Sequence, residues 1–502
     1  MNGLISKKSV FIIAGFVGFI FLIGGSYALW KYASDVNANI NTITYGLDYY
    51  INYTKGQDIT NKVLNQSEDY TGGNSVDIEL WKKNDTYDIY GHIYLDVNEI
   101  GNNLRRASAL KYVVLCDEEI ISSGSLRGIK QDKKILLKGD IPLLTNKQVF
   151  SVYVWLDIND DADKSIGGEA LDIGIRCEAT MMELGLANYD GNRETIAEKI
   201  KNMYGSASKT TVINNGITYD YASSVNLMED VDGNIRYYGA NPSNYLYFNC
   251  SDYNNQTAST CETWRIIGLF GDNLKIVRGS SIGNYPYDNS NPISSIYGTN
   301  NWAKARIMKL LNPNYNSESV GGSLYYNGGK GLCYYGGEEN IPCDFTTTGL
   351  KNSITRAFIE EMDWYLGGYN STSVYPDQIY QYERSSNAYG VWKGKVALPY
   401  PSDYAYAADF NSCQSQLASY NVSSCTSTNW LDSVLRPTST SYAWLITPYS
   451  SNEHYVWYVN TTGNLNYDSA YRNLGIFPTV YLDFSSSVLS GTGTASNPYK
   501  LN

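Results

Sequence analysis

The chain has 502 residues. A single hydrophobic core rarely supports a chain of this length, so two or three domains are expected. Its 38 lysines and arginines against 50 aspartates and glutamates give a formal net charge of −12. This acidic balance opposes the attraction to phosphates that drives proteins onto nucleic acid, so no nucleic-acid partner is expected. The 47 tyrosines suit both half-buried strands and amphipathic binding surfaces, and most of them are expected in strands.

Residues 1–30 have the features of an export segment. Lys7 and Lys8 precede an uncharged run, residues 9–30, that is long enough to cross a hydrocarbon core of about 30 Å. Small residues at Ser26 and Ala28 predict cleavage after Ala28. The segment is therefore a signal peptide if cut, or a membrane anchor if uncut, with a buried soluble helix as the weaker alternative. Either export reading places the body at the cell surface or outside the cell.

Residues 31–183 are predicted to form an all-β sandwich. Apolar and aromatic residues occupy every second position from Ile43 to Tyr53, which is typical of a half-buried strand. The same alternation recurs in five further segments, at 76–80, 87–97, 110–116, 150–156 and 171–177. Six such strands separated by turns indicate an antiparallel sandwich. Cys116 and Cys177 are in phase with the inward residues, so they either bridge two strands or fill the core.

One loop of this region offers oxygen ligands in a spacing like that of calcium loops. Asp157, Asn159, Asp161 and Asp163 occupy alternate positions. The loop has Ala162 where such loops need glycine, and it has glycine in place of the closing glutamate. We therefore expect an acidic solvated turn, with calcium as the weaker alternative and no other cofactor.

Residues 184–236 are predicted to be a helical and polar linker. Asn192 can cap a helix with Ile196, Ile200 and Met203 at helical spacing, and Gly205 can end it. A polar stretch follows up to residue 234.

Residues 237–502 are predicted to form an α+β domain. A hairpin is expected about residues 271–273, helices at 302–311 and 350–366, and a strand at 480–482. Short strands mixed with helices and long loops are typical of the α+β class.

Six of the eight cysteines form three local couples, each ten to twelve positions apart. These are Cys250 with Cys261, Cys333 with Cys343, and Cys413 with Cys425. We predict a disulfide in each couple, worth about 3 kcal/mol, which requires an oxidising compartment. Reduced, buried cysteines are the alternative. A metal site is disfavoured because the chain lacks C-x-x-C spacing and has only His92 and His454.

The leader FIFLIGGSYALW, followed directly by a strand-rich region, resembles the TasA/camelysin group of Gram-positive envelope proteins. The resemblance covers the leader and, by pattern, residues 36–180. It implies a jelly-roll-like sandwich, release by a dedicated signal peptidase, and assembly into matrix fibres or surface deposits.

The C-terminal half resembles an uncharacterised family of bacterial surface domains. The resemblance is carried by YYGANPSNYLYFN, WRIIGLF, NNWAKARIMKLLN, LPYPSDYAYA, NWL, WLITPYS and GIFPTVYL, in that order. It implies a C-type-lectin-like or formylglycine-generating-enzyme-like fold. Phe477 stands where related domains have arginine in their terminal motif. The formylglycine-generating activity is not expected, because it needs a reactive cysteine pair and all six cysteines here fall into local couples.

The chain is predicted to be non-enzymatic, since it contains no P-loop, no H-E-x-x-H and no G-x-S-x-G motif. His454 lies beside a predicted strand, where a structural role is favoured over catalysis. Trp430 and Trp457 are candidate ligand-binding aromatics, while Trp264 and Trp444 are expected in the core.

The favoured hypothesis is a surface protein that binds or adheres to an external glycan or protein through its C-terminal domain. The alternative is a structural matrix or filament subunit that self-assembles through its sandwich. A hydrolase using scattered carboxylates is a third hypothesis, because a carboxylate pair leaves no sequence signature.

Overall fold

The structure is a computed structural model of the chain. It describes residues 43–501 apart from 45–46, 56–57, 61–63, 130, 132, 160–165, 167–168, 182, 184–187, 190, 192–193, 254, 290–297, 336–337, 386–388 and 483–487. The predicted export segment, with its cleavage site after Ala28, lies outside the described residues. Among the residues that are described, none of the helices is both long and apolar enough to traverse a bilayer. The chain is β-rich and divides into two compact units, Met1–Asn192 and Arg193–Asn502.

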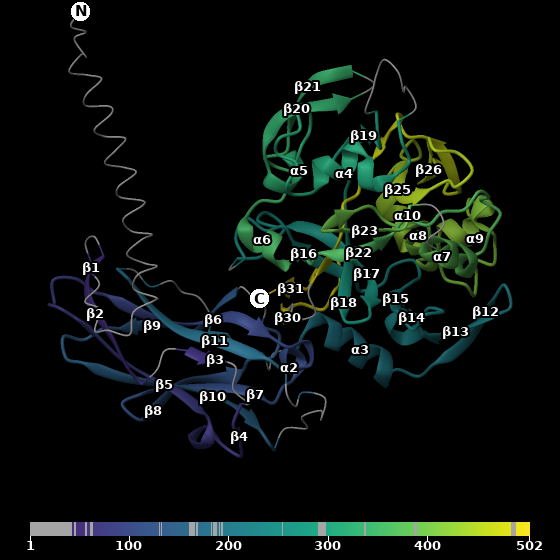
Figure 1. Ribbon diagram of the computed structural model, residues 1–502. Coiled ribbons are helices and arrows are strands. Elements are labelled where there is room, and N and C mark those ends of the chain that lie inside the picture. The colour runs from purple at the N-terminus through teal and green to yellow at the C-terminus, as the bar shows by residue number, and fades with distance from the viewer. Residues whose placement is uncertain are drawn as a thin grey trace, which may run out of the picture. The chain divides into compact units, whose positions relative to one another are not determined.

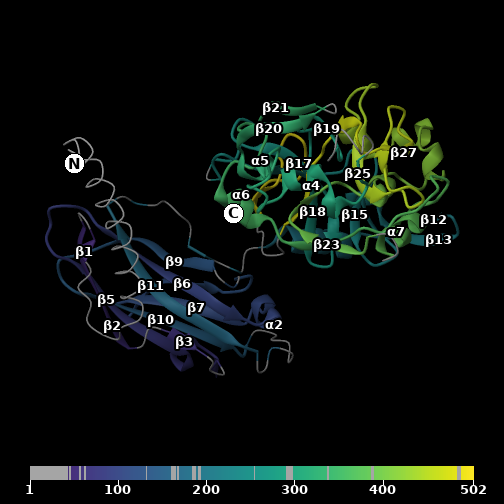
Figure 2. The same ribbon diagram turned by 45° about the horizontal axis from the view of Figure 1, so that its top comes forward.

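The first unit contains two β-sheets. The larger has the order β1 (Ile43–Thr44), β2 (Leu47–Lys55), β5 (Asn74–Lys82), β10 (Gln148–Asp157), β7 (Leu110–Cys116) and β8 (Glu119–Ser125), with β4 (Gln66–Ser67) parallel to β10. The smaller has the order β3 (Asp58–Thr60), β11 (Leu171–Thr180), β6 (Tyr90–Ile100) and β9 (Lys133–Pro142). The sheets lie over one another as two layers (Figures 1 and 2).

Alternating side chains of both sheets form one core. Val76, Val152 and Val114 are register partners on β5, β10 and β7, and all three are buried. Ile93 of β6 and Ile175 of β11 belong to the same buried cluster from the smaller sheet. The period-two pattern therefore predicted these inward residues, because successive strand residues point to opposite faces.

The segment that leaves the sandwich is hydrogen-bonded to its edge. The Tyr189 N–H donates to Leu136 O of β9 at 2.8 Å, and its hydroxyl donates to Arg127 O at 2.5 Å. The Gly191 N–H donates to Ser125 O of β8 at 2.8 Å. These residues were predicted to be linker, but they belong to the sandwich because their backbone N–H groups donate to one carbonyl on each of the edge strands β8 and β9.

The second unit is built on a nine-stranded sheet. Its order is β12 (Thr210–Asn214), β13 (Ile217–Ala222), β14 (Leu227–Glu229), β15 (Ile235–Tyr237), β17 (Glu262–Phe270), β18 (Asn273–Arg278), β29 (Thr479–Leu482) and β24 (Val396–Ala397), with β16 (Tyr245–Phe248) also paired to β17. A five-stranded sheet has the order β19 (Asn284–Pro286), β28 (Asn473–Gly475), β25 (Ala443–Pro448), β26 (Tyr455–Val459) and β27 (Leu465–Ser469).

Short hairpins and short helices complete this unit. The hairpins are β20 (Lys330–Tyr335) with β21 (Glu338–Asp344), β22 (Met362–Tyr365) with β23 (Val391–Gly394), and β30 (Val488–Ser490) with β31 (Lys500–Leu501). The helices are α3 (Ile196–Ser206), α4 (Arg306–Leu311), α5 (Leu324–Asn327), α6 (Ser353–Phe358), α7 (Pro376–Arg384), α8 (Pro401–Tyr406), α9 (Ser423–Thr426) and α10 (Trp430–Leu435).

The predicted helix at 350–366 is wrong in its second half. Only α6 is helical there, and β22 follows it. Trp364 is the register partner of Trp392 on β23, and its indole donates to Gly394 O at 3.1 Å. Pairing with a strand almost thirty residues away overrides the local helical spacing.

The predicted linker at 184–236 is also corrected from residue 196 onward. The N-cap of α3 is Thr195, whose side chain accepts from the Glu198 N–H in a capping box, rather than Asn192. Ile196 and Ile200 are buried in the core of the second unit. Strands β12 to β14 then extend the large sheet, so this stretch is part of the domain rather than a spacer.

The three disulfides predicted from cysteine spacing are confirmed, and all lie in the second unit. They join Cys250 to Cys261, Cys333 to Cys343, and Cys413 to Cys425.

Cys116 and Cys177 are free, so the predicted alternative of a bridge between them is wrong. They lie on β7 and β11, in different sheets, and each packs against the sandwich core. The other predicted role, filling the core, therefore describes them.

Candidate functional site

The two tryptophans predicted to contact a ligand are buried instead. Trp430 and Trp457 have no exposed surface. The Trp430 indole donates to Tyr237 O at 2.9 Å, and the Trp457 indole donates to Tyr369 O at 3.3 Å. The prediction fails because each ring finds both its apolar contacts and its hydrogen-bond acceptor inside the protein. Trp264 and Trp444 are buried as predicted.

The acidic loop is described only in part, because Asp161 and Asp163 lie outside the described residues. Asp157 Oδ1 accepts from the Asn159 N–H at 3.0 Å, and Asn159 Nδ2 donates to Glu68 O at 3.2 Å. These bonds are those of a turn. In the described part of the chain, no group of three or more acidic, histidine or cysteine residues is placed to hold a metal ion.

Five tyrosines gather on one surface of the second unit, which we call the tyrosine surface. It consists of Tyr369, Tyr382, Tyr449, Tyr455 and Tyr467. The rings of Tyr449 and Tyr467 stack with their centroids 3.9 Å apart, and Tyr455 lies 5.3 Å from Tyr467. Tyr369 and Tyr382 stack at 3.8 Å. The strands β25 and β26 and the helix α7 lie on the same side of this unit (Figure 1).

Backbone contacts join the two stacks into one surface. Tyr369 and Tyr449 form a parallel β-bridge, and the Tyr449 hydroxyl donates to Asn370 O. The buried Trp457 indole supports Tyr369 from below through its bond to the Tyr369 carbonyl. The surface therefore combines β26, β27, α7 and the segment that follows β22.

The buried amide of Asn300 holds the loop that carries Tyr449 and Tyr455. Its Nδ2 donates to the backbone oxygens of Asn452 at 2.7 Å, Tyr455 at 2.9 Å and Tyr449 at 3.3 Å. Its Oδ1 accepts from the Tyr389 hydroxyl at 2.6 Å. Because one amide satisfies three carbonyls, the loop is held in a defined conformation.

Two phenols of the tyrosine surface have raised pKa values. Burial, followed by the neighbouring Tyr467, raises the pKa of Tyr449. A hydrogen bond with Tyr369 and then burial raise the pKa of Tyr382, so both phenols stay protonated at physiological pH. Exposed polar side chains surround the rings, among them Asn370, Ser451 and Asn466. Aromatic faces beside amides and hydroxyls can bind sugars or polar protein surfaces.

Sequence reasoning missed this surface because no local pattern marks it. Tyr369 is 80 positions from Tyr449, and no local motif distinguishes the five tyrosines of this surface among the 47 tyrosines of the chain. Only the preference of tyrosine for binding surfaces pointed in this direction.

A buried charge network occupies the interior of the same unit. Arg236 Nε lies 2.6 Å from Asp230, and its Nη1 lies 3.1 Å from Asp403. Lys275 Nζ lies 2.6 Å from Asp403, and all these side chains are closed to solvent. The network joins β15, β18 and α8. Its carboxylates neutralise buried cations, so it serves the fold.

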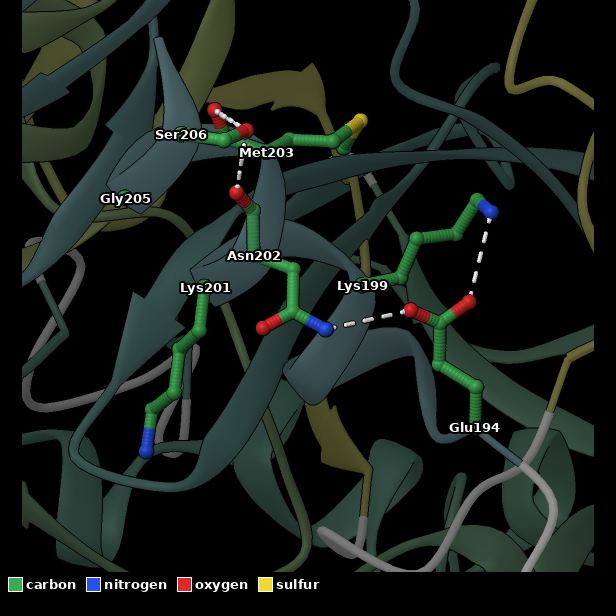
Figure 3. Close-up of a pocket in the computed structure, with 7 residues that line it drawn as sticks. All are labelled: Glu194, Lys199, Lys201, Asn202, Met203, Gly205 and Ser206. Carbon is green, nitrogen blue, oxygen red and sulfur yellow. Dashed lines mark hydrogen bonds and ion pairs between the residues drawn. The ribbon is translucent and has the colours of Figure 1, made fainter.

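A shallow hollow of about 480 Å³ lies along α3 (Figure 3). Its polar side chains satisfy one another, since Glu194 accepts from Lys199 at 3.4 Å and from Asn202 at 3.3 Å. Lys201 points away from this group and pairs with Asp272 at 2.6 Å. The hollow is therefore the solvated face of an amphipathic helix.

No family model and no curated protein matches the chain. Among solved structures, the chain is similar to the C-terminal domain of EclA, a sugar-binding protein, with 11% identity. That match covers 29% of this chain and 86% of the other, at a TM-score of 0.13. A likeness at this level carries no argument about fold or ligand, so the tyrosine surface is judged on its own geometry.

Proposed function

We propose that the protein is a non-enzymatic cell-surface protein whose second unit binds an external glycan or protein through the tyrosine surface. The observation that supports this most is the stack of Tyr449 on Tyr467 at 3.9 Å, on a surface where Tyr467 and Tyr382 remain exposed. Aromatic rings held rigidly at the surface lose little conformational freedom on binding. A ligand gains apolar contact from the rings and hydrogen bonds from the surrounding amides.

Export is part of the same proposal. The three disulfides are compatible with an extracellular protein, because such bonds persist in oxidising compartments. The leader resemblance implies delivery through the membrane. The jelly-roll-like sandwich and the lectin-like head implied by the two resemblances would then place the tyrosine surface outside the cell.

The test is a glycan array and a cell-surface pull-down with the exported chain and its variants. Y467A and Y382A should each lose at least tenfold in affinity for the ligand that the parent chain binds. Y442A is the matched control, because Tyr442 belongs to the same unit and is 37% exposed, as Tyr467 is. A parent chain that binds neither glycan nor surface protein contradicts the proposal, and so does equal loss in Y442A and Y467A.

We propose self-assembly as a second candidate function, because in the part of the chain that the structure describes the edge strand β8 has no strand partner on its outer side and is bonded there by Gly191 only at its end, Ser125. Among the described residues, β8 pairs with β7 alone in its sheet, and Ile120 on it is 51% exposed. An open edge can accept a strand from another copy. Electron microscopy of the exported chain should show filaments that I120K abolishes. Monomers at every concentration would contradict this second function.

A further inference from the structure

Arg265 is a buried cation that lacks a carboxylate partner. It lies on β17, opposite Tyr245 of β16, and only 5% of the residue is exposed. Its Nε donates to Asn244 Oδ1 at 2.6 Å, while its Nη2 is buried without a hydrogen-bond partner. Across the described residues, no acidic side chain contributes to its electrostatic surroundings, and burial lowers the pKa of Arg265 to about 10.

Among the described residues of the second unit, the other buried cations are neutralised. Arg236 and Lys275 share Asp403. Arg278, which lies on the neighbouring strand, makes two bonds to Glu262, at 2.8 and 3.0 Å. Removing a charge from water costs several kcal/mol, and these residues offset that cost with carboxylates. Arg265 does not, although it lies on the same sheet.

Two aromatic rings cover the Arg265 guanidinium. Its central carbon lies 3.6 Å from the Tyr245 ring centroid and 4.9 Å from that of Trp430. Rings attract the cation through its faces and leave its edges free for hydrogen bonds. Asn244 occupies the Nε position, so the edge that carries the unbonded Nη2 is left for a ligand.

Tyr245 is the part of this cover that reaches solvent. It is half-buried, and its hydroxyl donates to the exposed Asn241 at 3.3 Å. Trp430, in contrast, is fully buried and held by its indole bond to Tyr237 O. A ligand would therefore approach beside Tyr245, and a shift of this ring would open the Nη edge.

We propose that Arg265, with Tyr245 and Asn244, forms a binding site for the carboxylate group of a small ligand. Two carboxylate oxygens match the two Nη groups of a guanidinium in a bidentate pair, and a phosphate would be held less selectively. The carboxylate supplies the missing counter-charge. Such a group can belong to an acidic sugar or to an amino acid, and the experiment separates the two.

The test measures binding of glucuronate and of N-acetylglycine to the exported chain by calorimetry, with sodium chloride at equal ionic strength as reference. One or both carboxylates should bind and raise the unfolding temperature of the second unit by about 2 °C at saturating concentration. Glucuronate alone would identify an acidic sugar, and N-acetylglycine alone an amino acid. Glucose and N-acetylglycinamide, which lack the carboxylate, should not bind.

R265Q should abolish the binding, while R472Q should retain it, because Arg472 is an exposed arginine elsewhere in the same unit. R265K is the second variant if R265Q does not fold. It keeps the charge, loses the planar fork, and should bind at least tenfold more weakly. The proposal is overturned if the parent chain responds to the carboxylates no more than to chloride. It is also overturned if R265Q or R265K binds them as the parent chain does. Neither result bears on the tyrosine surface, which is tested with its own variants, Y467A and Y382A.

Discussion

Glu383 and Ser402 are joined by two hydrogen bonds inside the second unit. Glu383 Oε1 accepts from the Ser402 N–H at 2.8 Å, and Oε2 accepts from its hydroxyl at 2.5 Å. The pair connects α7 to the first turn of α8, and both side chains are buried. Burial raises the pKa of Glu383 to about 7, although both hydrogen bonds act in the opposite direction.

This carboxyl should make the second unit less stable as the pH rises. The unfolded chain loses the proton near pH 4.5, whereas the folded chain retains it up to about pH 7. Stability should therefore fall across this window by about 3 kcal/mol in total. E383Q, which keeps an acceptor for the Ser402 N–H, should remove the fall. Urea unfolding from pH 5 to pH 8 checks this, and an equal slope in E383Q would contradict it.

His92 should give the first unit the opposite response. Its Nδ1 accepts from the Asp140 N–H at 3.1 Å, so the neutral ring donates through Nε2 to Thr180 Oγ1 at 2.8 Å. Burial lowers the pKa of His92, so the unfolded chain binds the proton first as the pH falls. Stability should be complete above the ordinary value of 6.5 and decline below it.

The measurement is hydrogen exchange of peptides from β6 and β11, corrected for the intrinsic pH dependence of exchange. Protection should decrease between pH 7 and pH 5 in the parent chain. H92Q should lose this dependence. Protection that rises on acidification would show that His92 is charged in the folded protein.

Breaking the buried charge network should be costly. D403N leaves Arg236 and Lys275 without their shared carboxylate, so the free energy of unfolding should fall by about 3 to 5 kcal/mol. D468N removes the partner of the exposed Arg472 and should cost less than about 1 kcal/mol. Urea unfolding at one pH measures the free energy of unfolding of both variants. Similar losses in D403N and D468N would refute the stabilising role of the buried network.

Removing a disulfide should destabilise the second unit alone. The double variant C413S/C425S opens a loop closed across 12 positions and should cost about 3 kcal/mol. C116S changes a free thiol and should cost less than about 1 kcal/mol. Mass spectrometry before and after reduction should count three disulfides and two thiols. The same spectra report whether the N-terminus begins after Ala28.

Particular elements show where sequence reasoning succeeded. The alternation in β5, β6 and β10 predicted the inward residues of the sandwich, because each strand hides one face against the opposite sheet. Capping chemistry located α3, but its start was placed on Asn192 rather than Thr195. The residues of α3 that were read as a spacer carry an apolar face, and such a face needs a partner that a local pattern does not identify.

The candidate site shows where it failed. Trp430 and Trp457 were chosen for their chemistry, but burial makes them supports, with Trp457 lying beneath Tyr369. No sequence pattern singled out Tyr467 or Arg265. The role of Tyr467 follows from its exposure, and the role of Arg265 follows from its missing counter-charge.

The sequence alone determined the features that depend on neighbours close along the chain. The strand periods, the three disulfides across ten to twelve positions and the β-rich, multidomain character are of this kind, because short-range spacing sets which side chains share a face or meet across a loop. The tertiary structure decided which aromatic rings are exposed and which cations are neutralised. Tyr369 meets Tyr449, and Trp430 covers Arg265, only after segments 80 or more positions apart pack together.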